Sequence, residues 1–195
     1  NGYAHYTHLS NNRIRSNQGT LGGGIRVGNP LLECATFPDV NCPHQYVSSF
    51  NENMEIHHNQ ILANGSTDGG GGVGLFEGSD NYSLHDNVIC GNFTILYGGG
   101  VTQTGLSPGG SIVHNLVYNN QAFDEGGGIM IVGELMPTAV AESGLYQSDG
   151  TGSTVIDKNL IQGNMGGDDG GGLRLLMITG EDIRLNPTDP TQWYR

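Results

Sequence analysis

Basic residues, charge and long apolar runs are scarce in this sequence of 195 residues, and each scarcity excludes a class of protein. Seven Lys and Arg stand against 19 Asp and Glu, which gives a formal net charge of −12. A surface this acidic repels phosphate groups, so nucleic acid and anionic membranes are excluded as expected partners. Charged residues make up only 13 % of the chain, which argues against charge-driven disorder. No apolar run is long enough for a transmembrane helix.

Cysteine is also scarce, with three residues. Cys34 and Cys42 lie in a stretch that contains three prolines, and this context predicts a disulfide that closes a loop. Cys90 lies in a regular segment and is predicted to be a small buried hydrophobic residue. One disulfide favours an extracellular or cell-surface location.

Glycine and asparagine are abundant instead. The chain holds 34 Gly and 19 Asn, together more than a quarter of its residues. Both residue types are poor helix formers, so a helical bundle is excluded. The length predicts one domain over residues 1–195, which we expect to be part of a longer chain.

A repeated motif organises the sequence. It reads Asn, any residue, an aliphatic residue, two residues, Asn, and it occurs five times, at 12–17, 59–64, 87–92, 115–120 and 159–164. A glycine triplet and an aliphatic residue follow each copy, ending at Ile25, Val73, Val101, Ile129 and Leu173. The first asparagines are 47, 28, 28 and 44 residues apart. The basic unit is therefore 28 residues, and insertions at 29–49 and 134–152 lengthen two of the units.

These repeats predict an all-β solenoid of about five units. Each unit is predicted to contain three short strands: one that ends at the first Asn, one after it, and one that the glycine triplet opens. Stacked units place their aliphatic residues in one core and their asparagines in a ladder of hydrogen-bonded amides. Asn and Gly also suit left-handed turns.

The alternation of these asparagine units with GGG-aliphatic segments resembles the right-handed parallel β-helices of the pectin-lyase-like superfamily. It is also similar to the repeats of polymorphic outer-membrane proteins and other bacterial surface proteins. The resemblance covers about residues 9 to 180 and implies the fold. The superfamily contains polysaccharide lyases, glycoside hydrolases and epimerases as well as adhesins, so the resemblance does not choose an activity.

Three candidate sites follow from stacking the units. First, both insertions leave the strand that follows a glycine triplet, so they are predicted to emerge at one corner and to wall a shallow groove. The predicted groove floor contains Phe76, Glu77, Thr102, Gln103 and Thr104. Two tolerated insertions without a ligand are the alternative.

The second candidate site is an acidic cluster before the last two glycine triplets, formed by Asp124, Glu125, Asp168 and Asp169. Four close carboxylates are predicted to bind Ca²⁺, to have raised pKa values, or to extend into water. A catalytic carboxylate pair is a further alternative, with Asp124, Asp168, Asp169 and Arg174 as its residues. The lyases of the superfamily generally use a basic residue near bound Ca²⁺, and Arg174 is the candidate here.

The third candidate site is a set of histidines. Alignment on the first Asn places His57 and His85 in one column, with His58 and Asp86 in the next. Imidazole ligands suit Zn²⁺ or Cu²⁺. Outward-facing polar residues without a metal are the alternative, and no partner is predicted for His5, His8 or His44.

We therefore expect an extracellular or cell-surface structural or adhesive β-helix, with polysaccharide or other protein subunits as partners and Ca²⁺ as a possible stabilising ion. A polysaccharide-active enzyme and a transition-metal-binding surface protein are the alternatives.

Overall fold

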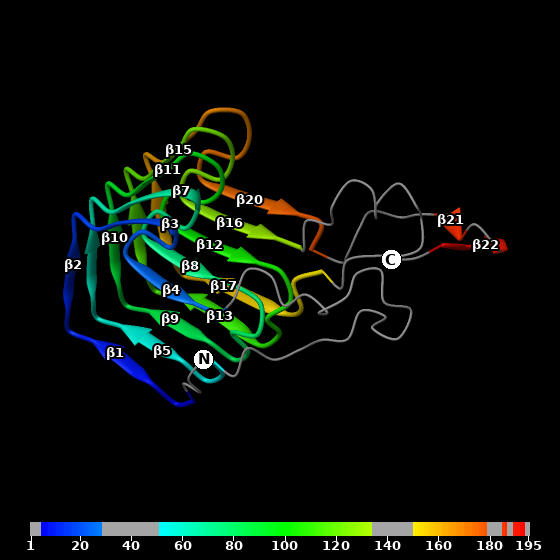
Figure 1. The fold of residues 1–195 in the computed structure, drawn as a ribbon, viewed down its shortest axis with the longest axis horizontal. Helices are drawn as coiled ribbons and strands as arrows, with labels where there is room; N and C mark the ends of the chain where they lie inside the picture. The colour runs from blue at the N-terminus through cyan, green and yellow to red at the C-terminus, as the bar shows by residue number, and fades with distance from the viewer. Residues whose placement is uncertain (1–4, 29–50, 134–149, 179–184, 187–188, 194–195) are drawn as a thin grey trace.

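The computed structural model describes residues 5–28, 51–133, 150–178, 185–186 and 189–193. All regular structure in these residues is β-strand, and twenty of the strands form four parallel sheets of five strands each. Each repeat unit contributes one strand to each sheet, so strands from successive units lie side by side (Figure 1). The arrangement is that of a parallel β-solenoid. No helix in the described parts is long and apolar enough to cross a membrane.

The four sheets are named A to D in the order in which a unit visits them. Sheet A contains β1 (His8–Ser10), β5 (Glu55–His57), β9 (Ser83–His85), β13 (Gly110–Val113) and β17 (Thr154–Asp157). Sheet B contains β2 (Arg13–Arg15), β6 (Gln60–Leu62), β10 (Val88–Cys90), β14 (Leu116–Tyr118) and β18 (Leu160–Gln162). Sheet C contains β3 (Gln18–Leu21), β7 (Gly65–Gly69), β11 (Phe93–Thr94), β15 (Gln121–Ala122) and β19 (Met165–Gly166). Sheet D contains β4 (Ile25–Val27), β8 (Val73–Leu75), β12 (Val101–Thr104), β16 (Ile129–Val132) and β20 (Leu173–Leu176).

The prediction of three strands per unit is wrong, because sheet C adds a fourth. Its strands lie between the second Asn of the motif and the glycine triplet and span only two to five residues. Such short segments lack an alternation that the sequence could reveal. They are strands because the neighbouring units above and below supply their hydrogen-bond partners.

Two continuous asparagine ladders connect the units, which confirms the predicted stacking. In each ladder the side-chain Nδ2 of one Asn donates to Oδ1 of the Asn in the next unit, at 2.9 to 3.1 Å. The first ladder contains Asn12, Asn59, Asn87, Asn115 and Asn159, and the second contains Asn17, Asn64, Asn92, Asn120 and Asn164. The residue before each first-ladder Asn has positive φ, between 52° and 59°. The ladders therefore tie each left-handed turn to the turn of the next unit.

The glycine triplets lie where adjacent units approach each other closely. A Cβ atom on Gly72 would lie 2.5 Å from the carbonyl oxygen of Gly100 and 3.0 Å from Nδ2 of Asn92. In the first four units the third glycine of the triplet therefore packs directly against the second asparagine ladder, where any side chain would collide.

The core between the sheets contains one aliphatic column from each of sheets A and B and two columns from sheet D. Ile56 and Leu84 occupy the sheet A column, Ile61 and Ile89 the sheet B column, and Val73 and Leu75 the two sheet D columns, all at most 1 % exposed. This apolar interior is continuous through the described units, which accounts for most of the free energy of folding in such a protein.

One polar side chain occupies an otherwise aliphatic column of sheet D. Gln103 occupies the inward position between Leu75 and Ile131 and is fully buried. Its Oε1 accepts hydrogen bonds from the Tyr82 hydroxyl at 2.6 Å and the Thr154 hydroxyl at 2.9 Å, and its Nε2 donates to the Thr151 carbonyl at 2.9 Å. The amide therefore has three partners, as a buried polar group requires.

Beyond the fifth unit the described strands do not continue the stack. β21 (Leu185–Asn186) and β22 (Asp189–Trp193) form an antiparallel pair of their own. Insertion 29–49 lies outside the described residues, as does 134–152 apart from its last three residues. The expected emergence of both insertions at one corner therefore stays a prediction.

Candidate functional site

The histidines that the alignment brought together lie on the outer face of sheet A. Along β1, β5 and β9 the aliphatic residues point into the core, so the residues on either side of them point outward. The strand register pairs His8 with Glu55 and stacks His57 on His85. Four titratable side chains from three units therefore gather on one face, and we call this group the imidazole cluster.

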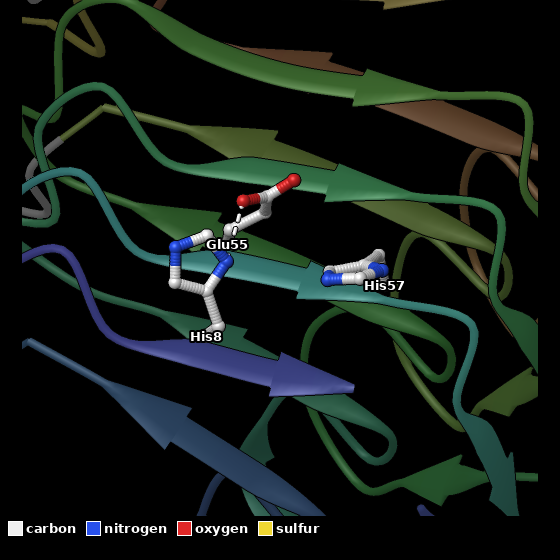
Figure 2. Close-up of side chains that lie close together, drawn as sticks. All are labelled: His8, Glu55 and His57. Carbon is white, nitrogen blue, oxygen red and sulfur yellow. Dashed lines mark ion pairs between the residues drawn. The ribbon is translucent and has the colours of Figure 1, made fainter. Parts of the chain in front are cut away.

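Glu55 is the centre of the imidazole cluster. Its Oε2 lies 2.6 Å from Nδ1 of His8, and its Oε1 lies 3.0 Å from Nε2 of His85. The contact between His8 and Glu55 is drawn in Figure 2, where His57 lies further along the same strand as Glu55. One carboxylate thus contacts an imidazole from the unit before it and an imidazole from the unit after it.

Two neighbouring residues orient the rings. The His57 and His85 rings are stacked, with centroids 5.0 Å apart and planes 3° from parallel. Nδ1 of His57 lies 2.9 Å from Nδ1 of His58, and Nδ1 of His85 lies 2.8 Å from Oδ2 of Asp86. His58 and Asp86 occupy the left-handed turn position before the ladder asparagines, with φ of 54° and 53°. The turn therefore places their side chains beside the histidines that precede them.

The contacts shift the pKa values of the cluster. The hydrogen bond from His85 lowers the pKa of Glu55, and the same imidazole lowers the pKa of Asp86. Burial opposes charge on His85, but its hydrogen bonds with Asp86 and Glu55 outweigh that effect and raise the pKa of His85. The cluster is therefore held together as an imidazolium between two carboxylates in mildly acidic solution.

The structure confirms that His57, His58, His85 and Asp86 come together, and it adds two residues that the sequence analysis missed. His8 and Glu55 each lie four positions before the first Asn of their units. Reading the aligned column at that position as well would have found them.

The acidic cluster is partly neutralised by Arg174. Its Nε lies 3.0 Å from Oε2 of Glu125, and its Nη2 lies 3.3 Å from Oδ2 of Asp169. The pKa of Asp124 is raised by partial desolvation, by a hydrogen bond with Asp168 and by the surrounding negative charges. The raised pKa was one of the predicted alternatives and is confirmed in direction at Asp124.

Calcium binding by the acidic cluster gains no geometric support. Across the described residues, the one group with three ligand atoms within 4.8 Å of one another is His8, Glu55 and His57. Hard cations such as Ca²⁺ take six to eight oxygens, whereas Arg174 already holds two of the four carboxylates. The calcium site stays a prediction.

A shallow recess of about 340 Å³ lies on the outer face of sheet C, beside the acidic cluster. Its lining consists of Gln121, Ala122, Phe123, Met165, Gly166, Gly167 and Asp168. Phe123 and Met165 are 71 % and 62 % exposed, and Phe93 of sheet C and Ile95, which follows its strand, are exposed as well. Apolar side chains gathered at the surface are typical of a binding face. This recess was not among the predicted sites, because it depends on strands that the sequence did not reveal.

The predicted groove floor lies on and beside sheet D. Phe76, Thr102 and Gln103 are at most 1 % exposed, Glu77 is 9 % exposed and Thr104 is partly exposed. The Thr102 hydroxyl donates to the Tyr97 carbonyl at 2.7 Å and accepts from the Gly70 amide. These polar groups are thus used within the protein, and a ligand at this floor stays a prediction.

The cysteine predictions have different outcomes. Cys34 and Cys42 lie outside the described residues, so their disulfide stays a prediction. Cys90 is a free thiol, as expected, but it is only half-buried. Its neighbour Ile89 occupies the inward position, which turns Cys90 to the outer face beside Tyr118.

Comparison with known proteins identifies no matching family model, no curated protein of similar sequence and no solved structure that matches.

Proposed function

We propose that this chain is a segment of an extracellular or cell-surface right-handed parallel β-helix that binds glycan on the outer face of sheet C. The four parallel sheets support the solenoid. Right-handedness follows from the strong preference of parallel β-crossovers and from the resemblance to the pectin-lyase-like superfamily. The acidic, lysine-poor composition agrees with partners that are not rich in phosphate.

The observation that carries the glycan proposal is the recess with Phe123, Gln121 and Asp168 in its lining. A sugar ring has an apolar face of C–H groups and a rim of hydroxyls. The exposed ring of Phe123 and the Met165 side chain offer an apolar surface to that face. The Gln121 amide and the Asp168 carboxylate offer donors and acceptors to the hydroxyls. The volume is at the lower end for small-ligand sites, so we expect recognition of one or two sugar rings of a longer chain.

Open apolar surface at the last unit supports a larger assembly. Leu173 and Leu175 pair in register with the core residues Ile129 and Ile131, yet they are 39 % and 47 % exposed. Covering these inward positions would bury apolar surface. We propose that further units or another subunit cover them.

A panel of neutral and uronic acid oligosaccharides tests the glycan proposal. Phe123→Ala should abolish the binding of any glycan of the panel that the natural chain binds. Val155→Ala is the matched control, because Val155 is a 57 % exposed apolar residue on sheet A. If no glycan of the panel binds, or if both variants bind alike, the proposal is wrong.

A glycoside hydrolase is the second candidate, favoured by the raised pKa of Asp124 next to the recess. The hydrogen bond between Asp124 and Asp168 would have to open for the two carboxyl groups to reach the separation of about 5 to 9 Å that such enzymes use. Hydrolysis of a glycosidic bond needs one protonated and one ionised carboxyl group. Asp124, with its raised pKa, suits the acid, and Asp168 lines the recess. Arg174 does not suit the role of a base, because its ion pairs raise its pKa further. Turnover of a bound glycan, lost in both Asp124→Asn and Asp168→Asn, would replace the binding proposal with this one.

A further inference from the structure

We propose that His8, Glu55 and His57 bind a divalent transition-metal ion, Zn²⁺ in the first instance, on the outer face of sheet A. Their ligand atoms all lie within 4.8 Å of one another. The site belongs to a different sheet from the glycan recess, so it does not depend on the proposed function.

The ligand set has the chemistry that zinc requires. Two imidazoles and one carboxylate, with remaining positions open to solvent, form a common three-ligand arrangement for Zn²⁺. In this protein the three residues come from two adjacent strands whose register holds His8 directly opposite Glu55. The strands are rigid, so the backbone positions are set before any ion arrives.

Closing the site requires only side-chain rotation. Zinc bonds of about 2.0 to 2.1 Å place neighbouring ligand atoms about 3.4 Å apart. His8 Nδ1 and Glu55 Oε2 already lie within that separation, at 2.6 Å. The His8 side chain is 62 % exposed and the Glu55 side chain 35 % exposed, so both can adjust by about an ångström without disturbing the core.

The surrounding contacts are those that orient metal ligands. Histidine ligands usually hydrogen-bond through their second ring nitrogen to a fixed partner. Nδ1 of His57 has such a partner in Nδ1 of His58, at 2.9 Å. His85 stacks on His57 at 5.0 Å and lies 3.0 Å from Glu55, so it is placed to hold the carboxylate in position.

A simple ion pair is the competing explanation for these contacts. An exposed His–Glu pair needs one histidine and one carboxylate, and it gains little stability. It does not require a second imidazole within ligand distance of both partners, as His57 is here. The net charge of −12 also raises the local concentration of cations.

Calorimetric titration of the untagged full chain with ZnCl₂ at neutral pH tests the proposal. We expect one Zn²⁺ per chain. Glu55→Gln and His57→Phe should each weaken binding by at least about tenfold. His57→Phe keeps a ring against His85 and removes only the nitrogens. When Co²⁺ is added in place of Zn²⁺, the natural chain should show the visible absorption of a low-coordinate site, and neither variant should show it.

The control is His114→Asn. His114 is an exposed histidine in the same turn position as His58, two units further along, and Asn tolerates its φ of 55°. This variant should bind Zn²⁺ as the natural chain does, and circular dichroism of each variant should show the same β-sheet spectrum. Absence of Zn²⁺ binding, or binding that Glu55→Gln and His57→Phe leave unchanged, would overturn the proposal. Equal loss in His114→Asn would also overturn it, because the ion would then not be specific to the cluster.

Discussion

Replacement of Asn87 by alanine should destabilise this protein far more than replacement of Asn12, although both belong to the same ladder. Asn87 is 1 % exposed, and its side chain takes part in five hydrogen bonds. Its Oδ1 accepts from the backbone and side-chain nitrogens of Asn59. Its Nδ2 donates to Asn115 Oδ1 and to the carbonyls of Ile56 and His85.

The magnitude follows from those contacts. Each intramolecular hydrogen bond contributes about 1 kcal/mol net, and a buried group left without a partner costs about 1 to 3 kcal/mol. Asn87→Ala leaves the buried backbone amide of Asn59 without its acceptor. Because the losses are coupled, we expect the free energy of unfolding to fall by about 3 to 6 kcal/mol. Asn12→Ala removes two bonds at an exposed position, where water replaces them, and should cost about 1 kcal/mol or less.

Urea denaturation followed by circular dichroism measures both values. A drop of several kcal/mol is a large share of the stability of a typical domain, so Asn87→Ala risks failing to fold. Asn87→Asp is the second variant, because it keeps the Oδ1 acceptor and removes the donors. Its buried carboxylate faces two carbonyls, so this variant should also lose stability at neutral pH. That loss in the free energy of unfolding should become smaller in acid as the carboxyl group is protonated. If Asn87→Ala costs no more than Asn12→Ala, the ladder does not stabilise the stack.

Three further predictions concern the turns, the core and the pH dependence. Gly91 has a φ of 65° with open space around its Cβ position, so Gly91→Ala should lower the free energy of unfolding by about 1 kcal/mol through backbone strain alone. Ala63 has a φ of 51° at the equivalent turn, so Ala63→Gly should raise it by about 0.5 kcal/mol in the same urea assay. Gln103→Leu leaves the buried Tyr82 hydroxyl without its acceptor and should lower the free energy of unfolding by about 1 to 3 kcal/mol. Adding Tyr82→Phe should recover part of that loss. If the effects of the two substitutions simply add, the hydrogen bond between Tyr82 and Gln103 does not couple them. The raised pKa of His85 means that its contribution to stability is present below the ordinary histidine pKa and is lost as the pH rises through the pKa of the folded state. Glu55 and Asp86, whose pKa values are lowered, lose their contribution to stability in acid. The difference in melting temperature between the natural chain and His85→Ala should therefore be largest at about pH 5 to 6 and should not grow toward pH 8.

Much of the architecture could be predicted because, in a repeat protein, the spacing of the repeats determines which residues of successive units are in contact. Once the spacing of 28 residues is known, Asn59, Asn87 and Asn115 must occupy equivalent places, and stacking makes them neighbours. The sequence by itself therefore determined the parallel sheets, the ladders and the alignment of His57 with His85.

Tertiary structure alone decided what lies between and around those repeats. The strands of sheet C are too short to show a pattern, and their pairing, together with the exposure of Phe123 that it produces, depends on the adjacent units. Side-chain direction also decided the sites: Gln103 points inward as the only amide of its core column in the described units, and Arg174 turns to Glu125 and Asp169. Periodicity determines which residues are stacked, whereas rotamers and burial determine which atoms meet.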